Sequence, residues 1–248
     1  MKCFALLLFA LLALAPAARA SAEKVVKDSI VSQGKKRTYY LFVPETVKGD
    51  APAPLLVTLH GSGRDGLSLV ERWKGLARKE GLIVVGPDSS DRAQWRIPED
   101  GPDLLFDLVE ALKSKYSINE RRVYLFGHSA GGGQALFMAL LESEYFAAVA
   151  VHAGYLDEQT YPLMDRARRK TPITIFVGTK DAGLPVPVAR ATRDALAGRG
   201  FPVEFTAIAG HTHAYYDRAD EINLSAWEFM KRHELAEAPR FERYQYGS

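Results

Sequence analysis

The sequence predicts an α/β fold in which a mostly parallel central sheet carries helices on both faces. Short apolar runs alternate along the chain with helix-like segments, which is the order that builds a parallel sheet. The run at residues 55–59 is apolar at almost every position, as expected for a strand that is covered on both faces. The 248 residues contain no internal repeat or linker, and this length suits a single domain.

The first elements are expected to be strands. Residues 25–32 and 37–43 are rich in β-branched and aromatic side chains, and they flank a polar turn that contains Gln33 and Gly34. This pattern predicts an N-terminal hairpin. A proline-rich loop follows, and the buried strand at residues 55–59 comes after it.

The next elements begin with a helix. Ser68 and Glu71 form a capping-box pattern, which predicts a helix from Ser68 to about Lys79. Gly81 is expected to end this helix. Residues 82–85 then form another short apolar run, which we expect to be a buried strand.

Pro102 begins a segment with an apolar stripe at helical spacing, which predicts a helix. The later elements follow the same alternation. Further strands are expected at residues 123–126, 146–151, 172–177 and 203–207, and further helices at 134–141, 187–198 and 220–233.

Two segments bear on the size of a cap and on where the folded domain ends. Only about twenty residues separate the strand at 146–151 from Pro172, so we expect a small cap or none. Residues 236–248 read as a polar C-terminal tail and a loose end. The folded domain is therefore expected to span residues 21–235.

The first twenty residues have the composition of a secretory signal peptide. Lys2 supplies a positive start, residues 4–15 are apolar, and Ala18-Arg19-Ala20 is a cleavage pattern. We expect cleavage after Ala20, a mature chain that begins at Ser21, and a secreted or periplasmic location. The apolar run is too short to span a bilayer, so we expect no membrane association after cleavage.

The net charge bears on nucleic-acid binding, and the cysteine content bears on disulfide bonds. Removal of the signal peptide takes away Lys2 and Arg19, which leaves 30 basic residues against 30 acidic residues. A net charge near zero argues against nucleic acid as a partner. The one cysteine, Cys3, lies inside the signal peptide, so the mature chain has no disulfide. We expect no cofactor.

The most informative stretch is Gly127-His128-Ser129-Ala130-Gly131. An apolar run precedes it and a helix-like run of small and apolar residues follows it. In this setting Gly-x-Ser-x-Gly places a serine on a sharp turn between a strand and a helix, with its hydroxyl exposed at the end of the sheet. Ser129 is therefore the candidate nucleophile.

Polar residues also follow other predicted strands. Asp181 follows the strand at 172–177, and both His211 and His213 follow the strand at 203–207. The carboxyl ends of parallel strands meet at one edge of a sheet, so these groups should gather around Ser129. The order serine, aspartate, histidine is that of a hydrolase triad in this architecture.

The remaining site residues follow from the chemistry of a tetrahedral intermediate, whose oxyanion needs fixed N–H donors. We expect one donor from the backbone of Ala130 and the other from the backbone of Ser62, in the glycine-rich loop after residues 55–59. Trp95 and Tyr155 lie on loops at the same edge and are candidates to line the substrate pocket.

These residues carry a resemblance to the α/β-hydrolase superfamily. Within it, the sequence is similar to the polyhydroxybutyrate-depolymerase and feruloyl-esterase-like group and to S-formylglutathione-hydrolase-type esterases. The motifs that match are Leu59-His60-Gly61-Ser62-Gly63, the serine pentapeptide, Gly178-Thr179-Lys180-Asp181 and His213-Ala214-Tyr215-Tyr216. The resemblance implies a serine esterase acting on a small or oligomeric ester. Tyr215 stands where depolymerases of this group often carry tryptophan, which disfavours a polymer substrate.

Several alternatives stay open at this point. A peptidase or an acyltransferase uses the same acyl-enzyme, and a hydrolase scaffold can also serve as a binding protein without catalysis. We favour His213 as the base because its following residues resemble the catalytic segment of the formylglutathione-type esterases, and we interpret His211 as a supporting residue. A metal site at His211, His213 and Asp217 is disfavoured, and Asp88 is interpreted as structural.

Overall fold

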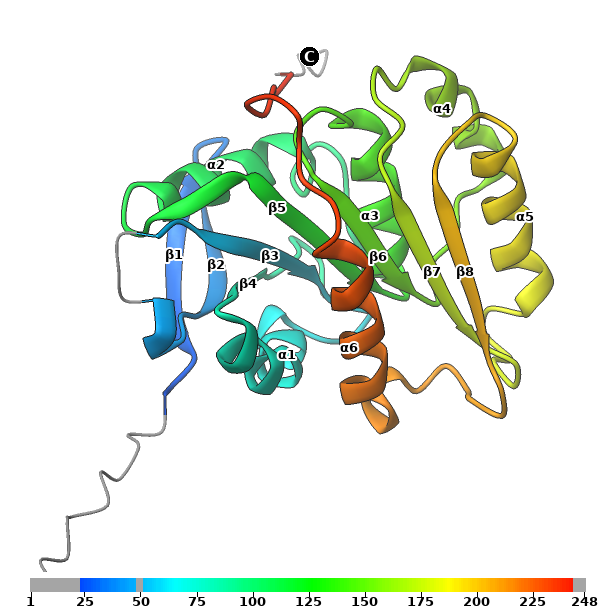
Figure 1. The fold of residues 1–248 in the computed structure, drawn as a ribbon, viewed down its shortest axis with the longest axis horizontal. Helices are drawn as coiled ribbons and strands as arrows, with labels where there is room; N and C mark the ends of the chain where they lie inside the picture. The colour runs from blue at the N-terminus through cyan, green and yellow to red at the C-terminus, as the bar shows by residue number, and fades with distance from the viewer. Residues whose placement is uncertain (1–22, 48–50, 243–248) are drawn as a thin grey trace, which may run out of the picture.

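The computed structural model describes residues 23–47 and 51–242. Within these ranges the chain forms an eight-stranded sheet in the order β1-β2-β4-β3-β5-β6-β7-β8 (Figure 1). The pairs β1/β2 and β2/β4 are antiparallel, and the other pairs are parallel. The strands are β1 Val26–Ser32, β2 Lys35–Phe42, β3 Ala53–Leu59, β4 Ile83–Pro87, β5 Ile118–His128, β6 Ala148–His152, β7 Ile173–Gly178 and β8 Val203–Ile208.

Alternating side chains of the strands build two separate cores. In β3, Leu55 and Val57 face one core and Leu56 faces the other, as the two-residue period of a strand requires. Helices α2 (Pro102–Lys113), α3 (Ala130–Leu141), α4 (Pro162–Arg166) and α5 (Val186–Ala197) cover the first core, and α1 (Gly66–Glu80) and α6 (Ala219–Met230) cover the second. This arrangement confirms the predicted fold class.

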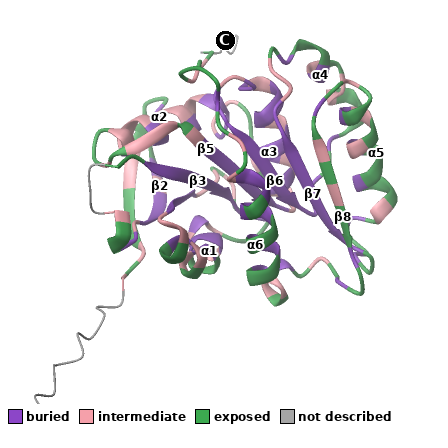
Figure 2. Cartoon of the chain, in the orientation of Figure 1, coloured by how far each residue is buried: buried purple, intermediate pink, exposed green. Residues whose placement is uncertain are grey.

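The sheet is buried at its centre and exposed at its edges (Figure 2). β4 and β6 are buried at every position, whereas the edge strands β1 and β8 each have one buried residue. The continuous apolar runs seen in the sequence therefore mark the central strands, because only those strands have helices packed on both faces.

The start of α1 differs from the prediction. The helix begins at Gly66, two residues before Ser68, and Asp65 is its N-cap. The Asp65 side chain accepts a hydrogen bond from the Ser68 N–H at 3.1 Å, so the capping role predicted for Ser68 is wrong. Glu71 does not close a capping box and instead pairs with Lys74 at 2.8 Å. Asp65, which immediately precedes the helix, supplied a competing cap.

The segment between β6 and β7 confirms the expectation of a small cap. It contains a 3-10 turn at Glu158–Thr160 and the five-residue helix α4. No further helix or strand occurs in this segment, all of whose residues the structure describes. The carboxyl ends of the central strands are therefore covered mainly by loops, which leaves the predicted site accessible.

The described part of the C-terminal tail is packed and is not a loose end. The ring of Phe241 stacks on that of Phe106 in α2, with centroids 4.1 Å apart. The Arg240 N–H donates to the carbonyl of Glu144 at 3.1 Å. One aromatic residue in a polar segment is enough to anchor it. The division at residue 235 stays a prediction, and the predicted signal peptide at residues 1–20 lies outside the described residues. None of the described helices is long and apolar enough to cross a membrane.

Candidate active site

Ser129 lies in a strained turn between a strand and a helix. β5 ends at His128 and α3 begins at Ala130, so Ser129 alone makes the turn. Its backbone has φ 56° and ψ −120°, a combination that residues other than glycine rarely adopt. The Ser129 N–H donates to the carbonyl of His152 at 2.9 Å, which ties the turn to β6.

Close backbone contacts require glycine on both sides of Ser129. A Cβ at Gly127 would lie 2.1 Å from the carbonyl oxygen of Gly131, and one at Gly131 would lie 2.0 Å from the carbonyl oxygen of Leu59. No side chain is tolerated at these distances. The Gly-x-Ser-x-Gly pattern is therefore explained by the close approach of α3 to β5 and to the end of β3.

The structure brings Ser129, His213 and Asp181 together. The Nε2 atom of His213 lies 2.9 Å from the Ser129 hydroxyl oxygen, and its Nδ1 atom lies 2.8 Å from Oδ2 of Asp181. The other carboxylate oxygen of Asp181 accepts from the N–H groups of Gly183 at 2.9 Å and Leu184 at 2.7 Å. The Asp181 side chain is fully buried, whereas that of His213 is 41% exposed. The three side chains thus form one hydrogen-bonded chain that runs from the interior to the surface.

The two competing candidates are placed elsewhere. His211 contacts His152, with 3.1 Å between the two Nε2 atoms, and it is 5% exposed. The Asp88 carboxylate accepts from the N–H of Gly66 at 2.9 Å, at the start of α1. Neither residue is hydrogen-bonded to Ser129 or His213, which is the arrangement expected if both have structural roles.

The loop after β3 presents Ser62 to Ser129. The imidazole of His60 supports this loop: its Nε2 accepts from the Ser89 N–H at 3.1 Å, so its Nδ1 donates to the Gly61 carbonyl at 2.9 Å. Burial lowers the pKa of His60, which keeps this imidazole neutral and able to accept. Among the described residues, neither the Ser62 N–H nor the Ala130 N–H has a hydrogen-bond acceptor.

Ser129 lines a cleft of about 440 Å³, which we call the aromatic cleft. Trp95 and Tyr155 both line it, as do Ser62 and Ala130. A larger cavity of about 580 Å³ beside Arg166 and Arg240 has no histidine in its lining. The aromatic cleft, which contains Ser129 and His213, is therefore the candidate substrate site.

Sequence reasoning missed most of the other lining residues. Gly133 and Phe137 lie four and eight positions after Ser129 on the face of α3 that lines the aromatic cleft, so helical spacing could have identified them. Leu156 and Leu184 come from loops far apart in the sequence, and no local signal marks them.

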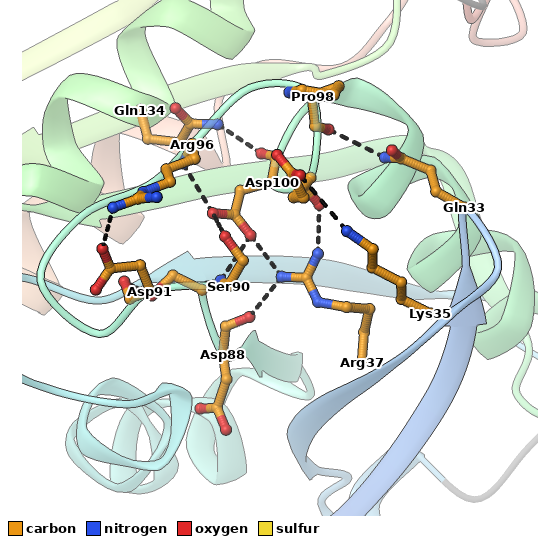
Figure 3. A network of polar contacts seen from close by, with 12 residues as sticks. Gln33, Lys35, Arg37, Asp88, Ser90, Asp91, Arg96, Pro98, Asp100 and Gln134 are labelled. Atoms are coloured by element: carbon orange, nitrogen blue, oxygen red, sulfur yellow. Dashed lines mark hydrogen bonds and ion pairs between the residues drawn. The ribbon is translucent and has the colours of Figure 1, made fainter.

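The loop that carries Trp95 is held by a buried polar network (Figure 3). Arg37 reaches from β2 to Asp100, with 2.5 Å between Nη2 and Oδ1, and it also donates to the Asp88 carbonyl at 3.0 Å. The Asp100 carboxylate accepts from the N–H and hydroxyl of Ser90 at 2.8 and 2.7 Å and from the Arg96 N–H at 2.8 Å. The indole N–H of Trp95 itself donates to the His60 carbonyl at 2.9 Å. We call the contacts among Arg37, Ser90, Arg96 and Asp100 the loop network.

Comparison with known proteins places the fold and the family. The bifunctional acetylxylan esterase/xylanase of Neocallimastix patriciarum is 28% identical over 162 residues, which cover 64% of this chain and 23% of that protein. The poly(3-hydroxybutyrate) depolymerase of Ralstonia pickettii is 25% identical over 162 residues, which cover 56% of this chain and 33% of that protein. The chain thus spans a third or less of the length of these two relatives.

Solved structures identify the same architecture. The S-formylglutathione hydrolase of Staphylococcus aureus superposes with a TM-score of 0.70 at 16% identity, and the match covers 85% of this chain and all of that one. This likeness shows that the fold is that of the α/β hydrolases. The model of the Dienelactone hydrolase family matches residues 80–244, which is well over half of the chain. The chain therefore belongs to the dienelactone hydrolase family.

Proposed function

We propose that this protein hydrolyses carboxylic esters, with Ser129 as the nucleophile, His213 as the general base and Asp181 as the residue that orients His213. The observation that carries the proposal is the hydrogen-bonded chain from Ser129 through His213 to a fully buried Asp181. The strained backbone of Ser129 adds support, because such strain in an otherwise regular fold is common at functional sites.

The proposed reaction begins when Ser129 attacks the ester carbonyl carbon and its hydroxyl proton passes to Nε2 of His213. The Asp181 carboxylate accepts from the Nδ1–H of His213 and stabilises the imidazolium that forms. The proton then passes to the leaving alcohol oxygen as the ester C–O bond breaks, which leaves an acyl-enzyme. Water, activated by the same imidazole, releases the acid.

Two N–H groups are proposed to bind the oxyanion of the tetrahedral intermediates, those of Ser62 and Ala130. Both residues line the aromatic cleft, and neither N–H has an acceptor within the described chain. Donors that are already in place need no reorganisation when the negative charge develops, which is the main electrostatic advantage of such a site.

The space around Ser129 suits a substrate with two parts. Ser129 lines the aromatic cleft and also a second cleft of about 540 Å³, which is lined by Arg64, Tyr216 and Asp217. Ser62, Ser129 and His213 line both clefts. We therefore propose that the acyl and alcohol parts of the ester occupy different clefts, the aromatic cleft and the cleft that contains Arg64 and Asp217.

Replacement of Ser129 tests the proposal. In Ser129→Ala, kcat on p-nitrophenyl esters should fall by at least about 10³-fold while the far-UV circular dichroism spectrum is unchanged. A fluorophosphonate probe should label the native protein at Ser129 and should not label the variant. The matched control is Ser225→Ala on the exposed face of α6, which should keep full activity. Near-native turnover by folded Ser129→Ala would refute the proposed mechanism, and faster turnover of aminoacyl amides than of esters would favour a peptidase.

We also propose that residues 1–20 direct export and are removed after Ala20. The support is the positive start, the apolar run and the Ala18-Arg19-Ala20 pattern. Mass spectrometry of exported protein should find Ser21 at the N-terminus. An intact Met1 on exported protein would contradict cleavage.

A further inference from the structure

Three histidines outside the proposed triad form a second hydrogen-bonded chain. The Nδ1 atom of His152 lies 3.0 Å from Nδ1 of His128, and its Nε2 atom lies 3.1 Å from Nε2 of His211. We call His128, His152 and His211 the histidine chain. Its members lie at the end of β5, at the end of β6 and on the loop after β8. The chain therefore links three segments that meet at the proposed active site.

The histidine chain lies directly beside the proposed triad. His128 immediately precedes Ser129, and its ring centroid lies 5.2 Å from that of His213. His211 lies two residues before His213 on the same loop. The buried ring of Tyr215, which follows on that loop, stacks on His128 with centroids 5.3 Å apart. His128 and His211 thus each lie within two residues of a member of the proposed triad.

Burial favours the neutral form of these imidazoles. His152 is fully buried, and His128 and His211 are 6% and 5% exposed. Burial, with smaller effects of neighbouring imidazoles, lowers the pKa of His128 to about 3 and the pKa of His152 to about 2. Burial also lowers the pKa of His211. The charged groups that act on the pKa of His128 are Asp181 and Arg64, and those that act on the pKa of His211 are Arg218, Asp217, Asp181 and Glu221.

Neutrality restricts the chain to two proton arrangements, because each neutral imidazole has one N–H and one acceptor nitrogen. In the first, His152 carries its proton on Nδ1 and donates to His128, while His211 donates from Nε2 to His152. In the second, His128 donates from Nδ1 to His152, and His152 donates from Nε2 to His211. The tautomers of all three residues are therefore coupled.

We propose that His152 is a positioning residue that joins the loop of His213 to the turn of Ser129, an inference that rests on the proposed triad. His152 contacts the turn twice, since its carbonyl accepts the Ser129 N–H at 2.9 Å and its imidazole contacts His128. It contacts the catalytic loop through His211. The joint keeps the hydroxyl of Ser129 and Nε2 of His213 at hydrogen-bonding distance.

Two conservative substitutions separate the two contacts of His152. The amide of glutamine ends near the position of Nε2, so His152→Gln retains a partner for His211. The amide of asparagine ends near the position of Nδ1, so His152→Asn retains a partner for His128. It loses the contact to His211 and so to the loop that carries His213. His152→Asn should lower kcat by about tenfold or more, because a small misplacement of a catalytic group is costly. The KM should change little, and His152→Gln should retain more of the native kcat than His152→Asn.

The matched controls are His233→Asn and His233→Gln. His233 follows α6, and its Nε2 atom is buried without a hydrogen-bond partner in the described structure. Both control variants should keep the native kcat. The second-order rate of Ser129 labelling by a fluorophosphonate should follow the same order as kcat, since it reports activation of the serine. Thermal melting establishes which variants are folded under the assay conditions.

The outcomes separate this inference from the proposed function. If Ser129→Ala is inactive while both His152 variants keep the native kcat, the positioning role is wrong and the triad stands. A larger loss in His152→Gln than in His152→Asn also overturns it. If Ser129→Ala remains active, the proposed function itself fails.

A measurement on the native protein avoids any folding defect of the variants. With ¹⁵N-labelled histidine, the side chains of His128, His152 and His211 should all be neutral imidazoles at pH 7, in one of the two coupled tautomer sets. A charged imidazole at His128 or His152 at that pH, or a combination of tautomers that neither arrangement allows, would overturn the proposal.

Discussion

Two buried polar networks hold the loops on either side of Ser129, and they do so with different chemistry. The loop network uses a charged pair, Arg37 and Asp100, together with three donors to the carboxylate from Ser90 and Arg96. The histidine chain uses neutral imidazoles that contact one another at 3.0 and 3.1 Å. The first holds Trp95 at the rim of the cleft, and the second lies beside His213.

The two networks reduce the free-energy cost of burying polar side chains in different ways. A buried carboxylate is costly unless a counter-charge and several donors surround it, and Asp100 has both. Buried imidazoles avoid that cost by staying neutral, but each one then depends on its neighbour for an acceptor or a donor. The first network should therefore fail when a charge is removed, whereas the second should fail when acid adds one.

The largest expected effect separates the two histidines of one loop. His213→Ala should lower kcat by about 10³-fold or more, as Ser129→Ala does, because members of a triad act as a unit. His211→Ala should cost only about tenfold, because it removes a support and not the base. Both variants should be measured on one ester at one pH. An inactive His211→Ala beside an active His213→Ala would reverse the assignment of the base.

The next effect concerns stability and the charged network. Asp100→Asn leaves the buried guanidinium of Arg37 without a counter-charge, so unfolding should become easier by about 3–5 kcal/mol. Urea denaturation measures this change. The matched control is Lys35→Gln, because Lys35 pairs with Glu99 at 3.5 Å in the same region but is 65% exposed. The control should cost less than about 1 kcal/mol, and equal losses in the two variants would remove the distinction between buried and exposed pairs.

The third effect is acid sensitivity of the neutral network. The pKa values of His128 and His152 are lowered from 6.5 to about 3 and about 2, so the unfolded chain binds these two protons more readily than the folded one. The free energy of unfolding should therefore be highest above about pH 6.5 and should fall as the pH drops toward 3. The slope approaches about 1.4 kcal/mol per pH unit for each histidine.

Urea denaturation at pH 7, 6 and 5 measures this slope. In His152→Gln one titrating group is gone, so the decrease toward acid should be shallower than in the native protein. His233→Gln is a weaker comparison, since the pKa of His233 is also lowered by burial but the side chain is half-buried. Parallel curves for the native protein and His152→Gln would show that His152 does not titrate on unfolding.

The smallest expected effect is at the rim of the aromatic cleft. Trp95→Phe retains an aromatic ring but removes the hydrogen bond to the His60 carbonyl, which measures 2.9 Å. The loss should be about 0.5–1.5 kcal/mol, and it should appear as a raised KM with nearly unchanged kcat. A large fall in kcat with constant KM would instead indicate that Trp95 supports the Gly61–Ser62 backbone through His60.

Local patterns were sufficient for most of the fold. Apolar runs marked the central strands, because a strand buried on both faces has little room for polar side chains. Gly81 marked the end of α1, where the backbone adopts a left-handed conformation with φ 66°. The start of α1 was mispredicted because Asp65 and Ser68 are both good caps, and only the hydrogen bond shows which one is used. The segment after residue 235 was misread as a loose end because a single aromatic residue, Phe241, gives no periodic signal.

The sequence by itself determined which residues could carry the chemistry. Ser129 was recognisable because its turn needs glycine at fixed positions, and a backbone requirement of that kind is written locally. Asp181 and His213 were recognisable because parallel strands end at one edge, so chain order alone places their loops together.

Only the tertiary structure decided which of two nearby histidines contacts Ser129 and what the other one does. It also joined His152 to His211 across 59 positions and Arg37 to Asp100 across 63. The physical reason is that a hydrogen bond between side chains depends on distance and direction in space. For residues on different strands, the number of positions between them in the sequence predicts neither the distance nor the direction between their side chains.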